Sequence, residues 1–426
     1  MDPYFSQEHY DLAREVRGFA LEIVGPEAGR FDREESFPWE TVRAIGERGW
    51  LGAPVPKALG GLGLDLLSYL LVIQELAAVD ASHAITVSAH TTLGTSPILT
   101  FGTDAQRQKY VPLLARGDVL GGFGLTEAGA GSDAGATRTR AVREDEGWRL
   151  NGAKRFITHA GVGEIFMVTA VTEPDRGTDG ITSFIVTKPT VDPEAAAAAG
   201  MGSAEKLGYT PGVRSGRKEE KMGWRASDTR ELLLEEARVG DDDVLGPPGE
   251  GFSNFMQTLD AGRVGLAALS LGLAEGAIRA ASEYTEKRVG FGREAFAFQS
   301  ERFRLAELAT ELQAARHLTY HAAWLMTRGR PFRSEAAMAK LQASELSMRA
   351  TGSAVELMGQ DGFSDEYPVE RMFRDAKVSE IGEGTSEIQK IVISRALAEQ
   401  YSSNIQTSFR RDAEGRPAGD SDNARS

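Results

Sequence analysis

The chain lacks cysteine entirely, since none occurs among its 426 residues. This absence excludes a disulfide framework, a thiolate metal site and a cysteine nucleophile. Positive charge is also in short supply: 48 Lys and Arg residues stand against 62 Asp and Glu residues, a formal net charge of −14. Proteins that bind nucleic acid or anionic membranes need clustered positive charge, so the sequence argues against both classes of partner.

A targeting segment and a membrane-length apolar run are not apparent either. Residues 1–10 are polar and acidic, without the basic start and apolar stretch of a signal peptide. The apolar window 66–79 is interrupted by Ser, Gln and Glu and falls short of the roughly 20 residues that span a bilayer. We therefore expect a soluble, cytoplasmic protein without membrane insertion.

Histidine is scarce, with six residues, and it offers no metal site. His317 and His321 lie four residues apart on a predicted helix, as two zinc ligands can, but no third ligand accompanies them. We interpret the two as a pair on a helix surface, and we predict no metal ion.

The hydrophobic fraction of 41% is ample for a packed core, and its periodicity changes twice along the chain. Residues 1–118 repeat apolar side chains at three- and four-residue steps, which predicts a helical domain whose first helix ends before Pro26. Residues 119–246 contain short β-prone segments, with a hairpin turn predicted at Asn151-Gly152. Within them, residues 189–211 carry an alanine run that we interpret as a solvated loop insertion.

Helical periodicity returns in residues 247–400 as four long blocks, the last covering 369–400. Long helices with short connections predict an antiparallel four-helix bundle. Residues 401–426, rich in Gly, Asp, Ser and Arg, predict a disordered tail. The expected fold class is α+β: an N-terminal helical domain, a middle β-sandwich or barrel-like domain and a C-terminal four-helix bundle.

A glycine-rich stretch, GGFGLTEAGAGSDA, occupies residues 121–134. It satisfies a G-x-G-x-x-A pattern, but a dinucleotide-binding fingerprint needs a helix after the glycines, and here a strand-like run follows. The remaining interpretations are equally open at this point. Either Thr126, Ser132 and the backbone amides of the turn grip a planar or anionic ligand, or the stretch is an ordinary tight loop.

Glu383 lies between two glycines, at the start of a predicted helix capped by Thr385 or Ser386. A carboxylate on such a turn beside apolar helices loses water, which raises its pKa and suits a general base near neutral pH. The alternative is a solvated loop acid. The two flanking glycines favour the functional interpretation.

Several longer motifs together match one family. In sequence order they are FGLTEAGAGSD at 123–133, NGAKRFIT at 151–158, KMGWRASDTRELLLEEARV at 221–239, LDAGRVGLAALSLGLA at 259–274, KRVGFGREAFAFQ at 287–299 and GFSDEYPVERMFRDAKVSEIGEGTSEIQ at 362–389. By these motifs the chain resembles the acyl-CoA dehydrogenases, FAD-dependent enzymes with a helical–β–helical fold. The resemblance covers about residues 5 to 400.

This resemblance implies a reaction of fatty acid β-oxidation and a role for Glu383. In it, Glu383 removes the α-proton of an acyl-CoA thioester, the β-hydrogen leaves as hydride to N5 of FAD, and a trans-2-enoyl-CoA forms. Electrons then pass to electron-transfer flavoprotein. The cofactor site of the family is shared across subunits, which implies a homotetramer. An oxidase-like enzyme that uses oxygen and a helical scaffold without catalysis are the alternatives.

The resemblance also assigns site residues by position. Catalysis falls to Glu383, and substrate binding to Ser132, Asp260, Arg263, Gly382 and Glu383. FAD binding is assigned to Phe123, Leu125, Thr126, Ser132, Phe156, Thr158, Arg288, Phe291, Gln299, Glu356, Gly359, Thr385 and Glu387. Among these, Arg288, Phe291 and Gln299 are expected to hold the FAD of a neighbouring subunit. The chain departs from the family pattern in three places. Gly382 and Phe156 stand where many members have an aromatic residue and Trp, and Glu356, Met358 and Gln360 differ from the usual QILGG-like run.

Overall fold

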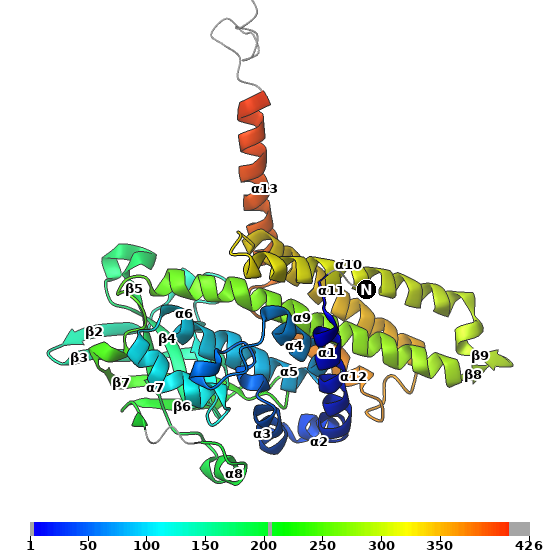
Figure 1. Ribbon diagram of the computed structural model, residues 1–426, viewed down its shortest axis with the longest axis horizontal. Helices are drawn as coiled ribbons and strands as arrows, with labels where there is room; N and C mark the ends of the chain where they lie inside the picture. The colour runs from blue at the N-terminus through cyan, green and yellow to red at the C-terminus, as the bar shows by residue number, and fades with distance from the viewer. Residues whose placement is uncertain (1–3, 203–206, 409–426) are drawn as a thin grey trace, which may run out of the picture.

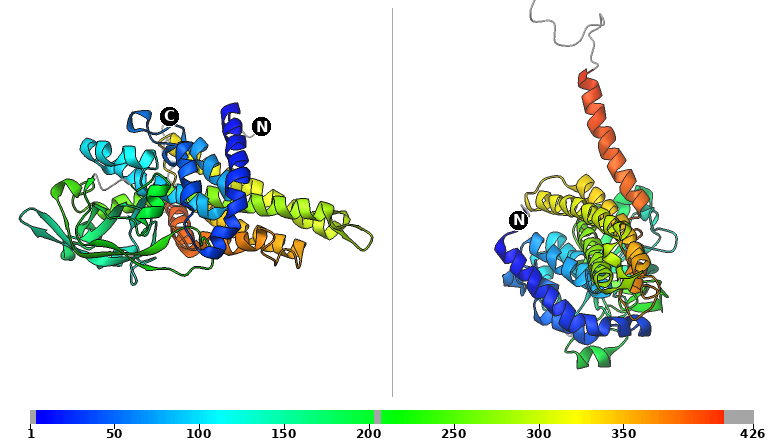
Figure 2. Two further views of the ribbon diagram at one scale, coloured as in Figure 1. Left: turned by 90° about the horizontal axis from the view of Figure 1, so that it is seen from below. Right: turned by 90° about the vertical axis from the view of Figure 1, so that its right-hand side faces the viewer.

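The computed structural model describes residues 4–202 and 207–408, and its architecture confirms the α+β class (Figure 1). A β-sheet lies at one end of the long axis, and long helices run from it to the other end. Shorter helices from the N-terminal part pack along one side of these long helices (Figures 1 and 2).

The N-terminal part is helical as predicted. Its α-helices are α1 (Gln7–Phe19), α2 (Gly25–Glu34), α3 (Trp39–Glu47), α4 (Leu66–Ala77), α5 (Ala81–Ser88), α6 (Ser96–Phe101) and α7 (Asp104–Ala115). The prediction that the first helix ends before Pro26 is wrong in part. A π-helical turn, Ala20–Val24, joins α1 directly to α2, and Pro26 lies in the first turn of α2, where no backbone N–H is needed.

Helix α4 packs directly against α9 (Gly251–Lys287), the longest helix of the molecule's described part. Gly272 and Gly276 make this contact possible. A Cβ atom at Gly272 would lie 2.2 Å from the Gln74 carbonyl oxygen, and one at Gly276 would lie 2.3 Å from that of Ala78. By length and composition α9 could cross a membrane, but 78% of its apolar window is buried inside the protein, as expected of a core helix.

The middle part forms one curled seven-stranded sheet with the strand order β1-β4-β2-β3-β7-β6, and β5 pairs with β4. Its strands are β1 (Gly121–Gly124), β2 (Arg140–Glu144), β3 (Gly147–Thr158), β4 (Ile165–Val171), β5 (Ile181–Thr187), β6 (Val213–Lys218) and β7 (Thr229–Val239). β1 runs parallel to β4, whereas β3 pairs antiparallel with β2 and β7.

The predicted hairpin turn at Asn151-Gly152 is wrong, because β3 runs straight through both residues. The chain instead turns between Glu144 and Gly147. Asn151 lies at an irregularity where the register against β7 shifts, and its side-chain amide donates to the Glu236 carboxylate over 2.7 Å. The residue pair that is typical of a turn therefore marks a β-bulge in this chain.

The insertion at 189–211 is not the uniformly solvated loop that we expected. Its alanine run forms the short helix α8 (Pro193–Ala198), capped by the Asp192 carboxylate, and Ala196 and Met201 are buried. Alanine has the highest helix propensity, so a capped run of it turns helical when one face can pack.

The C-terminal part holds α9, α10 (Gln299–Thr327) and α11 (Arg333–Met358). The β8–β9 hairpin (Val289–Gly290 and Arg293–Glu294) joins α9 to α10 at the far end of the body, and residues 328–332 join α10 to α11. The fourth predicted block, 369–400, is two helices: α12 (Val369–Ser379) packs beside α11, and α13 (Ser386–Ser408) projects from the body (Figures 1 and 2). α13 also continues past residue 400, so the tail cannot begin at 401. Residues 409–426 lie outside the described residues.

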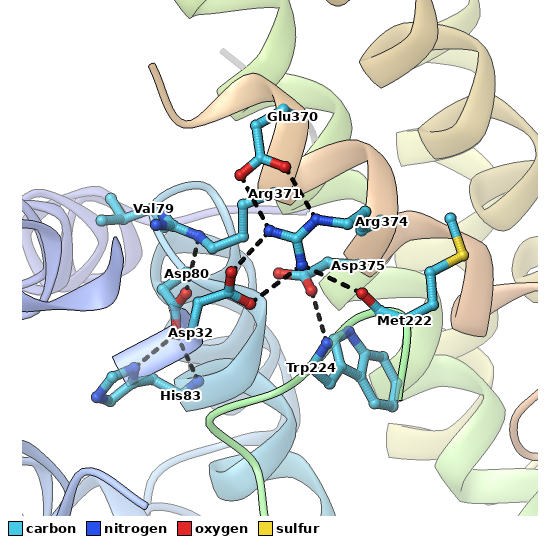
Figure 3. A network of polar contacts seen from close by, with 10 residues as sticks. All are labelled: Asp32, Val79, Asp80, His83, Met222, Trp224, Glu370, Arg371, Arg374 and Asp375. Atoms are coloured by element: carbon cyan, nitrogen blue, oxygen red, sulfur yellow. Dashed lines mark hydrogen bonds and ion pairs between the residues drawn. The ribbon is translucent and has the colours of Figure 1, made fainter. Parts of the chain in front are cut away.

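A polar network ties α12 to the two other parts of the molecule (Figure 3). The Arg374 guanidinium donates to Asp32 of α2 at 2.6 and 3.2 Å, to Glu370 and to the Met222 carbonyl oxygen of the middle part. One residue on, the Asp375 carboxylate accepts the Trp224 backbone N–H over 2.6 Å, and burial raises the pKa of Asp375 to about 7. This network fixes the helix that leads into the turn at Glu383.

Candidate active site

The turn between α12 and α13 places Glu383 in an unusual conformation. Glu383 and Gly384 have φ angles of +53° and +95°, and the left-handed region is uncommon for a residue other than glycine. The Glu383 carboxylate is turned inward, and its Oε2 atom is buried without a hydrogen-bond partner among the described residues. Burial raises the pKa of this carboxyl to about 7, although the positive charges of Lys340 and Arg263 act to lower it.

The Glu383 carboxylate rests against the backbone of α9. A Cβ atom at Gly262 would lie 2.2 Å from Oε2 of Glu383 and 3.5 Å from Cδ2 of Leu93. Only glycine leaves that space open, so the position of the carboxylate depends on Gly262.

Arg263 and Asp260 lie one turn apart on α9 and form an ion pair. Burial lowers the pKa of Arg263 and raises that of Asp260, and the Arg263 Nε atom has no partner among the described residues. The ion pair lies close to Glu383, because the negative charge of Glu383 acts to raise the pKa of Arg263. Three of the predicted substrate residues therefore meet at one place, together with Gly382.

Three buried polar atoms in and after the turn at Glu383 fit an additional polar group. Oε2 of Glu383, Oγ of Ser386 and Oε1 of Gln389 have no hydrogen-bond partner among the residues described. Buried polar groups are rarely left unpaired in a native structure. These atoms and the adjacent Thr385 and Glu387 match a site that is completed by a cofactor and a substrate.

The glycine-rich stretch is anchored by a buried ion pair between Glu127 and Lys154. Nζ of Lys154 donates to Oε1 of Glu127 over 2.8 Å, and Glu127 also accepts from Thr137, from the Arg138 N–H and from Thr139. Burial would raise the pKa of Glu127, but Lys154 and the hydroxyl donors hold it at about 2. The carboxylate therefore stays charged and fixes the loop on β3.

Around this anchor lie the residues predicted for one cofactor surface: Phe123, Leu125, Thr126, Ser132, Phe156 and Thr158. The Phe123 ring stacks on Phe255 of α9 at 3.9 Å between centroids, which brings β1 close to the helix that carries Arg263. Ser132 is exposed, and Phe156 is 56% exposed with a φ of +57°. Exposed, conformationally restricted residues beside an anchored loop are typical of a ligand surface.

The structure does not bring the other predicted cofactor residues to this place. Arg288, Phe291 and Gln299 lie on or beside the β8–β9 hairpin, at the far end of the body from the sheet (Figure 1). Arg288 follows Arg263 by 25 helical positions, which is about 38 Å along the axis. Glu356 and Gly359 belong to the same far end, where the Glu356 carboxylate pairs with Arg304 of α10.

Two alternative sites find no support in the described residues. After β1 the glycine-rich stretch leads through a short 3-10 turn, Ala134–Ala136, to β2, so no helix follows the glycines as a dinucleotide fingerprint requires. His321 stacks on the Trp324 ring, and the described residues contain no group of three His, Cys, Asp or Glu side chains suited to a metal ion.

Comparison with known proteins decides the family. The N-terminal, middle and C-terminal domain models of acyl-CoA dehydrogenase match residues 6–118, 122–237 and 249–398. The chain belongs to the acyl-CoA dehydrogenase family. Members of this family are FAD-dependent oxidoreductases, which fits the unpaired polar atoms of the turn and the anchored loop.

Relatives in the acyl-CoA dehydrogenase family cover almost the whole chain. The short-chain specific acyl-CoA dehydrogenase of Clostridium acetobutylicum is 42% identical over 92% of this chain and 99% of its own. The structure of butyryl-CoA dehydrogenase from Megasphaera elsdenii is 40% identical with a TM-score of 0.87, over 93% and 100%. A chain in the structure of the electron transferring flavoprotein of Acidaminococcus fermentans matches equally well: 40% identity, TM-score 0.87, 93% and 99%.

Sequence reasoning missed four residues that the geometry brings into the site. Glu127 and Lys154 lie inside the quoted motifs, but nothing in their spacing indicates that they pair. Gly262 lies more than 120 positions before Glu383 in sequence and Lys340 more than 40, and only packing brings them together. A glycine and a lysine inside regular helices carry no local signal of this kind.

Gly262→Ala tests whether the helix backbone sets the position of the carboxylate. The new Cβ would force Oε2 of Glu383 out of its place, and a displacement of about 1 Å can cost up to about 100-fold in rate. We expect kcat for flavin reduction to fall at least about tenfold with FAD content and melting temperature unchanged. The matched control is Gly18→Ala on α1, where the Cβ meets no atom within 4 Å. An unchanged kcat in Gly262→Ala would show that the reaction does not depend on the position of the Glu383 carboxylate against Gly262.

Proposed function

We propose that this acyl-CoA dehydrogenase oxidises short-chain acyl-CoA thioesters, with Glu383 as the base that removes the α-proton. The observation that carries the proposal is the Glu383 carboxylate, buried, unpaired and held on a left-handed turn against Gly262. A carboxylate whose pKa burial raises to about 7 is half ionised near neutral pH and is a stronger base than a solvated one.

The residues around Glu383 have separate roles in the removal of the α-proton. The Glu383 carboxylate takes the α-proton, and the backbone N–H of Glu383 would donate to the thioester oxygen, where negative charge develops. Arg263 lies beside the base and is the first candidate for the positive charge that the polyanionic CoA needs. Bound FAD supplies the two-electron oxidation. Thr126, Thr158 and the loop anchored by Glu127 would hold its ring system.

Packing beside Glu383 supports a short acyl chain. One turn beyond Gly262, a Cβ atom at Gly265 would lie 3.1 Å from the Ser88 hydroxyl and 3.8 Å from Ile73, so α9 already touches α4 and α5 there. The Tyr69 hydroxyl and the Thr92 hydroxyl close the same region with a 2.8 Å hydrogen bond. The names of the relatives, short-chain specific and butyryl-CoA dehydrogenase, agree with a shallow acyl site.

The separation of the predicted cofactor residues supports a shared site. Arg288, Phe291 and Gln299 lie too far from Arg263 along α9 to contact the same flavin in one chain. Phe291 is fully exposed there. We therefore propose a homotetramer in which this end of one subunit completes the FAD site of another, and electron-transfer flavoprotein as the acceptor.

Steady-state oxidation of a series of acyl-CoAs tests the reaction and the acceptor together. We expect butyryl-CoA to give a higher kcat/KM than octanoyl- or palmitoyl-CoA with an artificial dye or electron-transfer flavoprotein as acceptor. Hydrogen peroxide should form at a small fraction of that rate. Peroxide formed stoichiometrically at the full rate would make the enzyme an oxidase. A protein purified without flavin and inactive with every chain length would favour a scaffold.

A further inference from the structure

Lys340 is a buried lysine that the chemistry described so far does not use. It lies on α11 with an exposed fraction of 0%, and its Nζ atom donates a hydrogen bond to the Gly384 carbonyl oxygen over 2.9 Å. Burying an ammonium group is costly unless an interaction offsets the loss of water. Lys340 contacts Gly384, which follows Glu383 directly in sequence. The hydrogen bond that offsets the cost of burying the ammonium group is therefore made at the catalytic turn.

The Gly384 carbonyl oxygen is the point at which the turn is held. It accepts from Lys340 and also from Nε2 of Gln389, over 2.8 Å. Both Glu383 and Gly384 are left-handed, and such a conformation persists only where the surroundings fix it. The two donors lie on α11 and α13, so hydrogen bonds from two helices fix the conformation of the turn.

We propose that Lys340 is a positioning residue for Glu383. Its ammonium group fixes the left-handed turn through the Gly384 carbonyl oxygen, and its positive charge favours the ionised form of the base. The inference rests on the proposed function, because it takes Glu383 as the base.

The electrostatics of the pair agree with this role. Burial raises the pKa of Glu383, and among the charges around it Lys340 has the largest opposing effect, followed by Arg263. Burial lowers the pKa of Lys340 to about 8, so its ammonium is charged over the range in which Glu383 ionises. The remaining titratable groups that act on the pair are Tyr69 on α4, Glu380 after α12 and Glu387 on α13. Asp260 on α9 and Arg333 on α11 act on Arg263.

Lys340→Gln separates charge from hydrogen bonding, because it keeps a donor and removes the charge. Loss of a positive charge disfavours the carboxylate form, so the acidic limb of the pH profile of kcat/KM moves to higher pH. We expect a shift of about one pH unit, which is about tenfold lower kcat/KM at pH 6.5. Above pH 8 the difference should shrink, since the wild-type lysine then loses its own charge.

Lys340→Met removes both charge and donor, and it should show the same shift with a further loss of kcat at every pH. The matched control is Lys390→Met on α13, because the Lys390 side chain is 58% exposed and pairs with Glu345 across 3.8 Å at the surface. FAD content and melting temperature of each holoenzyme show whether it is folded. If Lys340→Met does not fold, the shift in Lys340→Gln decides alone.

An acidic limb that stays in place in Lys340→Gln would overturn the inference, even if kcat falls uniformly. That outcome leaves the proposed function intact as long as Glu383→Gln abolishes flavin reduction. If Glu383→Gln keeps its activity, the proposed function fails, whatever the profile of the Lys340 variants shows.

Discussion

Glu383→Gln is expected to lower the rate of flavin reduction by acyl-CoA about 10⁴-fold, the upper range for removal of a general base. Glutamine keeps the shape of the side chain on its left-handed turn but cannot take a proton at neutral pH. The variant should still purify yellow and should bind butyryl-CoA with a Kd within a fewfold of wild type. Stopped-flow absorbance of the flavin band under anaerobic conditions measures the rate.

Glu366→Gln is the matched control for this experiment, because Glu366 is an exposed carboxylate in the loop before α12. It should reduce flavin at the wild-type rate. If Glu383→Gln bleaches the flavin nearly as fast as the wild type does, another carboxylate removes the proton, and Asp260 would be the next one to test.

Arg374→Met is expected to cause the largest loss of stability among the substitutions considered. The guanidinium joins Asp32, Glu370 and the Met222 carbonyl oxygen, and Asp32 is only 4% exposed (Figure 3). Removing one partner of a buried ion pair leaves an uncompensated charge and costs about 3–5 kcal/mol. Thermal denaturation of the holoenzyme, followed by circular dichroism and by flavin fluorescence, should show a clear fall in Tm.

Arg349→Met controls for the loss of an arginine as such. Arg349 lies on α11 and pairs with Glu311 at the surface, where an ion pair contributes at most about 1 kcal/mol. Its Tm should stay within about 2 °C of wild type. Equal melting temperatures for both variants would mean that the network at α12 does not join the three parts of the chain in the way described.

Most of the fold follows from periodicity. The α–β–α order, the β-prone character of residues 119–246 and the long helices could be predicted because their apolar side chains repeat in regular patterns. The errors lie where a short signal meets tertiary packing. Asn151-Gly152 is typical of a turn, yet the pairing of β3 with β7 continues through it as a bulge. Ala195–Ala199 has no apolar stripe, yet it becomes helical once Asp192 caps it.

The candidate site could be predicted in its parts but not in its assembly. The flanking glycines indicate Glu383, and the family motifs indicate the loop at Thr126 and the pair Asp260 and Arg263. No local pattern indicates that Gly262 makes room for the carboxylate or that Lys340 holds the turn, because both contacts depend on how α9, α11 and α12 cross. The resemblance implies a cofactor site shared across subunits, and the position of the β8–β9 hairpin at the far end of the body from the sheet agrees with that expectation.

Anaerobic titration of the purified holoenzyme with butyryl-CoA tests the central claim most directly. It asks whether the flavin, the substrate and the base work together, without any external acceptor. We expect the absorbance band of the oxidised flavin to bleach with about one equivalent of butyryl-CoA per subunit. We expect crotonyl-CoA, the enoyl product, to cause no bleaching. A flavin band unchanged by excess butyryl-CoA, in a protein with full FAD content, would contradict the proposed reaction.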